Sequence, residues 1–444
     1  MTAPPRTGRT SRWFPLTHLS GSLLLGAGLL VAGALLGRAD VAAIGVAPLL
    51  AAAWAWSNRP DEDLTVELRA AQQLSTDRTL TAPVRIDAPP GARAARLRVS
   101  SPGTEPDDAL VRLPPDGARE MVVATTSVRT GENALFRVDA VGLGPGATTA
   151  SSVVTVGPAS VLVMPGWQPL AELPLPLRLQ GLVGPHSSRR IGDGTELHDV
   201  APFAPGDRLR RIDWRTSARR GMQGDRLQEL YVRRTQATAD ATVMLVIDSR
   251  DEVGPDVATW AGAFQVLRSD ATSLDIAREA AASLTRAYLA QGDRVGLEDL
   301  GRRQRPVRPA AGRRHLERIV RRLALSAPES TVRARVRAPL LPSGALVIVL
   351  STFLDDDAMT LALTWRHSGH RVVAVDVLPP VRTSQLRTRM RLAHRMVEAQ
   401  RADRLTVLRR GGVEVVRWAG DSPPPSGGRV ELAALGRGRH GAPR

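Results

Sequence analysis

The chain has 444 residues, which suggests two or three domains rather than one. Its formal net charge is +16, but every basic residue is an arginine, and arginine, alanine, glycine and proline abound as GC-rich codon usage alone would produce. The charge is therefore not by itself evidence for a nucleic-acid partner. The absence of cysteine excludes disulfides, thiolate metal sites and a cysteine nucleophile.

Two uncharged apolar stretches, Leu19 to Leu36 and Val41 to Trp56, predict a transmembrane helical hairpin over residues 19–57. Each stretch is near the lower limit for crossing a bilayer, which is roughly 17–25 residues. Tryptophans flank the pair, and five glycines would let two helices approach closely.

Arginines surround the hairpin unequally, because three precede it and one follows it, whereas Arg38 alone lies between the two stretches. The positive-inside rule then places both ends in the cytoplasm. We expect a basic cytoplasmic N-terminus at residues 1–18 and a multi-pass protein of the plasma membrane with most of the chain cytoplasmic. The alternative is a signal peptide, which the second apolar stretch disfavours.

Residues 61–165 predict a small β-sandwich, since short runs with a period of two alternate with Pro-Gly, Asp-Gly and Thr-Gly turns. The expected strands are Leu64–Leu68, Val84–Ile86, Ala95–Val99, Met121–Ala124, Leu135–Val138 and Val153–Val156. No catalytic constellation is present in this stretch, and a spacer or docking role is the simpler interpretation.

Residues 180–220 form the most informative block. Gly192-Asp193-Gly194 and Pro205-Gly206-Asp207 predict two tight turns, because glycine and proline adopt the backbone angles that turns need. Trp214 is expected to anchor the block in a core, and the arginines around Asp213 predict an ion-pair network. We therefore expect a structured loop that wraps the first strand of the next domain.

This block resembles the domain of unknown function 58 family. The matching residues are Gly184, His186, Ser188, Gly192, Gly194, Glu196, Phe203, Pro205, Gly206, Asp207, Arg210, Ile212, Asp213, Trp214, Ser217, Ala218 and Arg219. The run from Pro205 to Arg219 carries the most specific part of the resemblance. The resemblance implies a von Willebrand factor A-like domain after the block, and a MoxR-type AAA+ ATPase as a partner.

Other interpretations of the block concern chemistry. His186 with Glu196 and Asp213 would suit a metal or an acid–base pair, but a lone histidine beside turn residues is more often structural. The arginines would suit phosphates. However, Gly192-Asp193-Gly194 lacks the ending of a phosphate-binding loop, and no aromatic ladder accompanies the arginines. We therefore predict no catalytic residue and no specific nucleic-acid partner.

Residues 240–420 predict an α/β domain. Thr242–Ile247, Ala345–Leu350 and Arg371–Val377 are continuous apolar strands, and helical stripes alternate with them. Strands of this kind form a parallel sheet covered by helices on both faces, which is a doubly wound fold. The arginines between 302 and 322 predict a solvated helix face, with an anionic partner as the second interpretation. Residues 421–444 predict a mostly disordered tail.

The family resemblance implies a metal at Asp248, held by an Asp-x-Ser-x-Ser loop and by a threonine and an aspartate from later loops. Here Arg250 and Glu252 occupy the two serine positions, and Thr352 occupies the position of a later aspartate. Because an arginine only donates hydrogen bonds, we expect a degenerate site without metal or other cofactor. A lesser alternative is Mg²⁺ held by Asp355–Asp357, which more simply predict a helix start.

The predicted fold class is multidomain: a transmembrane helical hairpin, a small β-sandwich, and a doubly wound, von Willebrand factor A-like α/β domain. The main functional hypothesis is a non-enzymatic membrane scaffold or adaptor that works with a MoxR-type AAA+ ATPase in the assembly or maturation of client proteins, with lipid contacts through the hairpin. One alternative is an arginine-rich binder of anionic lipid or nucleic acid. The second alternative is a hydrolase, for which the sequence has no nucleophile elbow or metal-binding helix.

Overall fold

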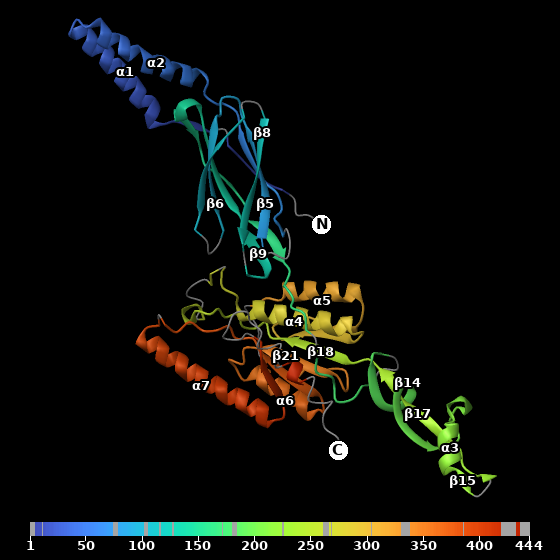
Figure 1. The fold of residues 1–444 in the computed structure, drawn as a ribbon. Coiled ribbons are helices and arrows are strands. Elements are labelled where there is room, and N and C mark those ends of the chain that lie inside the picture. The colour runs from blue at the N-terminus through green and yellow to red at the C-terminus, as the bar shows by residue number, and fades with distance from the viewer. Residues whose placement is uncertain are drawn as a thin grey trace. The chain divides into compact units, whose positions relative to one another are not determined.

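The computed structural model describes residues 5–10, 12–73, 79–101, 105–114, 117–126, 128–170, 172–179, 184–223, 226–260, 266–267, 269–302, 304–329, 338–384, 386–418 and 432–435. The chain divides into two compact units. The first consists of Met1–Val163 and Gln265–Asp270, and the second of Met164–Phe264 and Ala271–Arg444. Figure 1 labels the elements of both units.

A helical hairpin belongs to the first unit. Helix α1 (Thr17–Leu35) and helix α2 (Ala39–Ser57) are both long and apolar enough to cross a membrane, as the sequence predicts. The helices lie side by side because glycines at the contact have no side chain (Figure 1). A Cβ on Gly33 would lie 2.5 Å from the backbone nitrogen of Ala42.

Two β-sheets and a short strand pair share one apolar core in the first unit. The first sheet has the order β1-β3-β5-β4, with β8 beside β5: β1 (Arg6–Thr10), β3 (Leu64–Leu68), β5 (Thr79–Ala88), β4 (Gln72–Gln73) and β8 (Gly117–Thr126). The second has the order β2-β11-β10-β6-β7, with β12 beside β10: β2 (Trp13–Pro15), β11 (Thr149–Ser151), β10 (Arg137–Leu143), β6 (Ala94–Ser100), β7 (Asp107–Arg112) and β12 (Val154–Val156). The pair is β9 (Gly131–Leu135) with β13 (Ala159–Val163), and the turn η1 covers Pro145–Ala147.

The core of this unit follows from the alternation of side chains along each strand. In β3 the apolar residues Leu64, Val66 and Leu68 are buried and alternate with half-buried polar residues. The expected strand Leu135–Val138 is wrong as a single element, because Phe136 has a φ of 55° and separates β9 from β10. That break lets the fully buried Phe136 ring enter the core.

The N-terminus differs from the separate basic segment expected for residues 1–18. Residues 6–10 pair with β3 in an antiparallel register, and residues 13–15 pair with β11. Edge strands expose unpaired backbone groups, and the N-terminal strands pair with these groups. Gly8 permits the close approach, since a Cβ there would lie 2.7 Å from Cγ1 of Val154.

The second unit contains a six-stranded sheet in the order β20-β19-β18-β21-β22-β23. Its strands are β18 (Thr242–Ile247), β19 (Arg294–Asp299), β20 (Val307–Ala310), β21 (Leu346–Ser351), β22 (Arg371–Asp376) and β23 (Glu414–Arg417), all parallel except β20. The helices are α4 (Ser273–Ala290), α5 (Arg313–Leu325), α6 (Asp357–His367) and α7 (Thr388–Arg410), with the turn η3 at Val257–Thr259.

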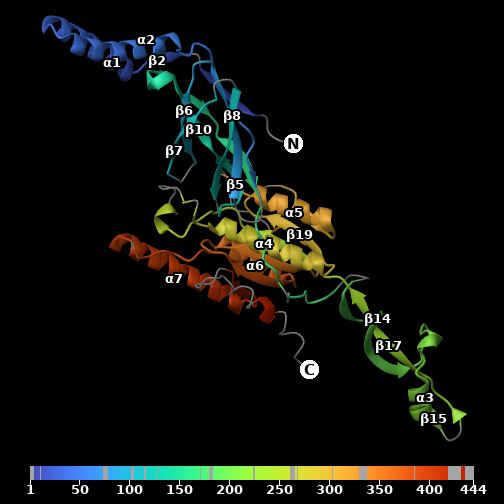
Figure 2. The same ribbon diagram turned by 45° about the horizontal axis from the view of Figure 1, so that its top comes forward.

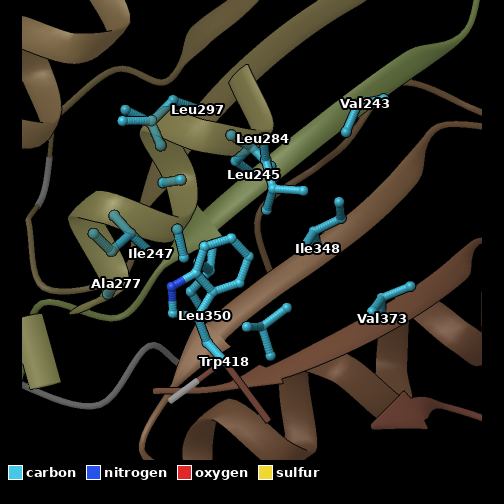
Figure 3. Packing of buried hydrophobic residues seen from close by; sticks show 14 of the residues in the cluster. Val243, Leu245, Ile247, Ala277, Leu284, Leu297, Ile348, Leu350, Val373 and Trp418 are labelled. Carbon is cyan, nitrogen blue, oxygen red and sulfur yellow. The ribbon is translucent and has the colours of Figure 1, made fainter. Parts of the chain in front are cut away.

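Helices cover both faces of this sheet, as continuous apolar strands predict. One core cluster joins the sheet to α4 and α5, and a second joins its other face to α6 and α7 (Figure 1). Figure 3 shows Leu245 and Ile247 of β18 and Leu350 of β21 packed near Trp418 in the first cluster. The expected layout of a doubly wound α/β domain is thus present.

The arginine-rich helix α5 turns its charges outward. Ile319 and Leu323 are fully buried, whereas Arg314, Arg318 and Arg321 are exposed, which agrees with the predicted solvated face. In the predicted tail, most residues lie outside the described ones. For residues 432–435 the predicted disorder is wrong, because they are helical and Leu432 is buried in the core of the α/β domain.

A long two-stranded arm precedes the α/β sheet in the second unit. Strand β14 (His186–Pro202) pairs antiparallel with β17 (Tyr231–Ala239). We call residues 186–239 the arm and residues 203–230 the arm tip. The tip holds the turn η2 (Leu209–Arg211), helix α3 (Trp214–Arg220), and the short strands β15 (Met222–Gln223) and β16 (Arg226–Leu227). Figures 1 and 2 show α3 and β15 at the end of the paired strands.

The expectation that residues 180–220 wrap the first strand of the next domain is therefore wrong. The partner of β14 is β17, whose polar and β-branched residues suit a solvated strand pair. The register of β14 shifts three times, and these bulges absorb its extra residues. Because of these bulges, the sequence of β14 lacks a clear period of two. Without that period, the sequence pattern did not predict a strand here.

Candidate functional site

A guanidinium lies among three carboxylates at the carboxyl end of the α/β sheet. Nε of Arg250 donates to Oδ1 of Asp248 at 2.8 Å, and Nη2 donates to Oδ2 of the same carboxylate at 2.9 Å. Nη1 donates to Oδ2 of Asp357 at 2.6 Å, and Nη2 donates to Oδ1 of Asp355 at 3.1 Å. The Arg250 side chain is only 11% exposed, so the cluster is a partly buried, fork-like charge network.

The strand ends hold this cluster in place. Asp248 follows β18, and its Oδ2 accepts a 2.8 Å hydrogen bond from Oγ of Ser351 at the end of β21. Asp355 and Asp357 lie at the start of α6, where carboxylates are favoured by the helix dipole, as the sequence predicts. Burial lowers the pKa of Arg250, but the hydrogen bond and charge of Asp248 outweigh it, so the pKa is raised overall.

Two residues that sequence analysis placed at the metal positions, Glu252 and Thr352, form hydrogen bonds with other parts of the domain. Oε1 of Glu252 accepts a 2.8 Å hydrogen bond from Oγ1 of Thr272, the residue that caps helix α4. The hydroxyl of Thr352 accepts a hydrogen bond from the backbone N–H of Leu354. The backbone carbonyl of Thr352 accepts one from Nε of Arg401 at 2.7 Å.

The set of donors at Asp248 does not fit a Mg²⁺ site. Magnesium needs oxygen ligands in a near-octahedral arrangement, and a guanidinium presents only N–H groups to its surroundings. Arg250 takes up both oxygens of Asp248 and also binds Asp355 and Asp357. Its single positive charge offsets the carboxylates that a metal would otherwise neutralise.

Asp251, beside this cluster, destabilises the folded state to an extent that depends on pH. Burial raises the pKa of its carboxyl, and the charges of Asp248 and Asp355 raise it further. A carboxyl with a raised folded-state pKa contributes stability below its unfolded pKa, near 3.9, and that contribution is lost as pH rises through the folded value. We expect Asp251→Asn to raise the thermal midpoint at pH 7 and to lose this advantage near pH 4. Calorimetric scans at both pH values test this, and a constant difference would contradict it.

The base of the arm is tied to the sheet by His186. Its Nε2 lies 2.9 Å from Oδ1 and 3.0 Å from Oδ2 of Asp293, a carboxylate that is fully buried. Oδ1 of Asp293 also accepts from the backbone N–H of Ala241 at 2.8 Å. Gly184 lies against the backbone of Ala239, where a Cβ would approach to 2.2 Å. His186 thus has a structural role, because it holds the base of the arm to Asp293.

The Gly192-Asp193-Gly194 segment is a bulge inside β14, so the predicted tight turn is wrong. Glycine is needed there because the two strands approach closely. A Cβ on Gly192 would lie 2.5 Å from Cα of Ala237, and one on Gly194 would lie 2.3 Å from the carbonyl oxygen of Gln236. In the same strand Ser188 is buried, and Glu196 is exposed.

Ion pairs connect the bulge to the arm tip. Asp193 accepts from Nη1 of Arg208 at 3.2 Å and also pairs with Nη2 of Arg211. Asp207 accepts from Nη2 of Arg234 at 2.9 Å, and this bond together with the backbone N–H of Ala204 lowers the Asp207 pKa. The network expected around Asp213 is therefore wrong in its carboxylate, because Asp193 and Asp207 accept these bonds, and Arg211 is the expected arginine that takes part among the described residues. Pro205 and Gly206 form the predicted turn, in which Gly206 has a φ of 100°.

Asp213 serves as the N-cap of α3. Its Oδ1 accepts from the backbone N–H of Thr216 at 2.9 Å, and this bond is the first cause of the lowered Asp213 pKa. Ser217 fastens the helix to β17, because its buried hydroxyl donates to the carbonyl of Asp213 and accepts from the backbone N–H of Tyr231, each at 2.8 Å. Ile212 forms an isolated bridge with Val232 in the same contact.

Removal of the Ser217 hydroxyl is expected to loosen α3. Ser217→Ala leaves the Tyr231 N–H without its acceptor, which costs about 1–3 kcal/mol for a buried donor. Amide hydrogen exchange should therefore accelerate at residues 213–220 and 231. Exchange in β18 serves as the internal control, since its bonds do not involve Ser217. Unchanged protection at Tyr231 would contradict the role assigned to Ser217.

The tip exposes large apolar side chains among arginines. Leu209 is 70% exposed and Trp214 is 64% exposed, so the predicted burial of Trp214 in a core is wrong. Phe203 is exposed at 36%. Arg210, Ala218 and Arg219 are also exposed, so the family-matching residues divide between a folded scaffold and an open surface.

Sequence reasoning missed several residues that hold these two sites. Asp355 and Asp357 were expected as a helix start or, as the lesser alternative, as Mg²⁺ ligands, and their binding to Arg250 required the tertiary fold. Asp293 and Ser351 lie 107 and 103 residues from their partners in the chain. Only Leu209 had a local signal, since an apolar residue between arginines at a turn is a candidate for an exposed contact.

Comparison with known families bears on the arm tip and the sheet end together. Residues 199–386 match a family model described as Protein of unknown function DUF58. The matched region contains Asp207, Asp213, Asp248 and Arg250. A search of curated proteins found no match to the chain.

Proposed function

The chain belongs to the domain of unknown function 58 family, and on this premise we propose that it is a non-enzymatic, membrane-anchored adaptor whose arm tip binds a partner protein. The observation that carries the proposal is the exposure of Leu209 and Trp214 on a structured tip. Large apolar side chains exposed together on a surface mark interaction sites, and tryptophan with arginine is typical of residues that dominate binding energy.

The charge of the tip suggests the chemistry of the partner. Between Phe203 and Tyr231 the sequence has seven arginines and four acidic residues. Such a surface favours an acidic partner face, which increases the association rate and excludes basic partners. The family resemblance suggests a MoxR-type AAA+ ATPase as this partner. In the proposal, the ATPase acts on a client protein while the adaptor holds it at the membrane.

The proposal assigns the anchor to α1 and α2. Both helices pass the length and hydropathy expected of membrane spans, and both stand near the N-terminus. With Arg6, Arg9, Arg12 and Arg59 at the open end of the hairpin and Arg38 at its turn, the open end faces the cytoplasm. This placement makes the protein multi-pass and leaves the α/β domain on the cytoplasmic side, where an ATPase has nucleotide.

The α/β domain is proposed to be von Willebrand factor A-like and metal-independent. The central position of β18 and the location of Asp248 after it support this likeness. Arg250 supplies an internal cation where such a domain would use a metal. Titration calorimetry of the full-length protein with Mg²⁺ is expected to show no binding heat. Tight Mg²⁺ binding that disappears in Asp248→Ala would contradict a degenerate site.

An affinity pull-down of the tagged, full-length chain from its native membrane tests the adaptor function. Run with and without ATP, it should enrich an AAA+ ATPase in a nucleotide-dependent manner. Recovery of lipid or nucleic acid alone, with retention that falls steeply as salt is added, would instead support the arginine-rich binder of anionic ligands.

A further inference from the structure

An apolar groove lies between the open ends of helices α1 and α2. Its volume is about 610 Å³, and its walls include Leu19, Leu23, Ala52, Ala53 and Trp56. Ala52 and Leu19 are 2% and 6% exposed and form its floor, whereas Leu23 and Trp56 are each 45% exposed at its rim. Cavities of this size, roughly 300–1,000 Å³, hold small-molecule ligands in other proteins.

The groove follows from where the two helices touch. A Cβ on Gly26 would lie 2.9 Å from the carbonyl oxygen of Gly45, so the backbones are in close contact at this pair. Toward Ala52 the helix passes Pro48, which lacks the N–H of a regular helical bond and disturbs helix geometry. Small residues continue at Ala52 and Ala53, so this part of α2 lines the groove with short side chains.

A cation stands at the rim of the groove. The guanidinium carbon of Arg59 lies 4.2 Å from the centre of the Trp56 ring, which is a cation–π contact. Tryptophan and arginine at a helix end are the residues that contact lipid headgroups at the membrane interface. The apolar groove is therefore next to the positive charge of Arg59, at the end of α2 where a lipid headgroup would lie.

We infer that this groove holds an acyl chain of one anionic phospholipid, whose headgroup phosphate pairs with Arg59. The inference rests on the proposed membrane anchoring of the hairpin. Thr17 and Ser20 also line the groove, but the Ser20 hydroxyl donates to the carbonyl of Thr17, so the lining is mainly apolar and suits hydrocarbon better than a polar ligand. The charge of Arg59 favours phosphatidylglycerol over the zwitterionic phosphatidylcholine.

Native mass spectrometry of the full-length protein from nonionic detergent tests the inference. Equal amounts of phosphatidylglycerol and phosphatidylcholine are added, and the lipid retained by each protein is counted. We expect one phosphatidylglycerol on the wild type and loss of that lipid in Ala52→Leu, which fills the floor of the groove. Ala51→Leu is the matched control, because Ala51 is exposed on the same helix and should leave the lipid bound.

Two further variants keep the test decisive. Ala53→Leu narrows the groove from another wall, so loss of lipid in both variants with an unchanged helical circular dichroism spectrum excludes misfolding as the cause. Arg59→Gln should keep one lipid but abolish the preference for phosphatidylglycerol. Equal retention by the wild type and Ala52→Leu would overturn the inference. So would a lipid-free dimer that dissociates in Ala52→Leu, because a second copy of the chain would then fill the groove.

Carbonate extraction of cell membranes separates this inference from the adaptor proposal. A chain that carbonate releases is not anchored, and both the anchoring and the lipid site then fail. A chain that resists carbonate but retains no lipid in mass spectrometry refutes the groove alone, and the anchor stands.

Discussion

Arg250→Ala is expected to lower the thermal midpoint of the α/β domain by about 6–12 °C. Breaking a buried ion pair by removing one partner costs about 3–5 kcal/mol. We take about 3 kcal/mol, because Asp355 and Asp357 are 43% and 41% exposed and water screens part of their charge. For a domain of this size each kcal/mol corresponds to about 2–4 °C.

The physical reason is the loss of the guanidinium that pairs with Asp248, Asp355 and Asp357. Without Arg250 the Asp248 carboxylate, whose side chain is 4% exposed, keeps the hydrogen bond from Ser351 but loses its counter-charge. The remaining carboxylates repel one another in the folded variant. Acid reduces their negative charge and with it this repulsion, so the loss of stability should be smaller near pH 4 than at pH 7.

Calorimetric scans of the full-length protein measure this effect, with Arg313→Ala as the control. Arg313 forms an ion pair with Glu317 but its side chain is 91% exposed, so its removal should leave the midpoint almost unchanged. Arg250→Lys should be intermediate, because lysine keeps the charge but not the planar fork that reaches several carboxylates. A midpoint for Arg250→Ala equal to that of Arg313→Ala would show that the cluster contributes little to stability.

The double variant Leu209→Ala, Trp214→Ala is expected to abolish recovery of the AAA+ ATPase in the pull-down. Each residue is mostly exposed in the isolated chain, so truncation removes contact area without opening a cavity in a core. Truncation of a tryptophan that anchors an interface costs about 2 kcal/mol or more, which corresponds to roughly 30-fold in affinity. With both anchors removed, a transient complex should not survive washing.

The matched control for this variant is Leu110→Ala in strand β7. Leu110 is 70% exposed, like Leu209, but belongs to the β-rich unit. The control separates a specific effect of the arm tip from a general change in surface hydrophobicity. Hydrogen exchange in α3 should stay unchanged in the double variant, which excludes unfolding of the tip. Equal recovery of the ATPase by the double variant and the wild type would contradict the assignment of the tip as the binding surface.

A charge variant separates the electrostatic contribution of the tip arginines to association from the contribution of the apolar contacts of Leu209 and Trp214. Arg215→Gln with Arg219→Gln leaves Leu209 and Trp214 in place and removes two exposed cations. If the partner face is acidic, the association rate should fall and its dependence on salt should weaken, whereas dissociation should change little. Surface plasmon resonance with the purified ATPase measures both rates. An unchanged association rate would show that the partner face is not acidic.

Local sequence patterns predicted the elements that depend on near neighbours. The apolar stretches of the hairpin became α1 and α2, and continuous apolar runs became β18, β21 and β22. Asp355–Asp357 became the start of α6, because helix capping and the helix dipole act within one turn. The turn at Gly206 also followed from the residues themselves, since its φ of 100° suits glycine.

Tertiary structure alone decided the arm and the charge cluster. Gly192 and Gly194 suggested a turn, but they lie in a bulge because β17, more than 40 residues later, approaches their backbone closely. Trp214 suggested a core anchor, yet the short helix α3 packs through Ser217 and leaves the indole exposed. The sequence shows that Arg250 stands two residues after Asp248, but only the fold brings Asp355 and Asp357 to the same guanidinium. Composition and periodicity describe one segment of the chain. The bulge in β14, the exposure of Trp214 and the sharing of Arg250 by three carboxylates depend on which distant segments pack against that segment.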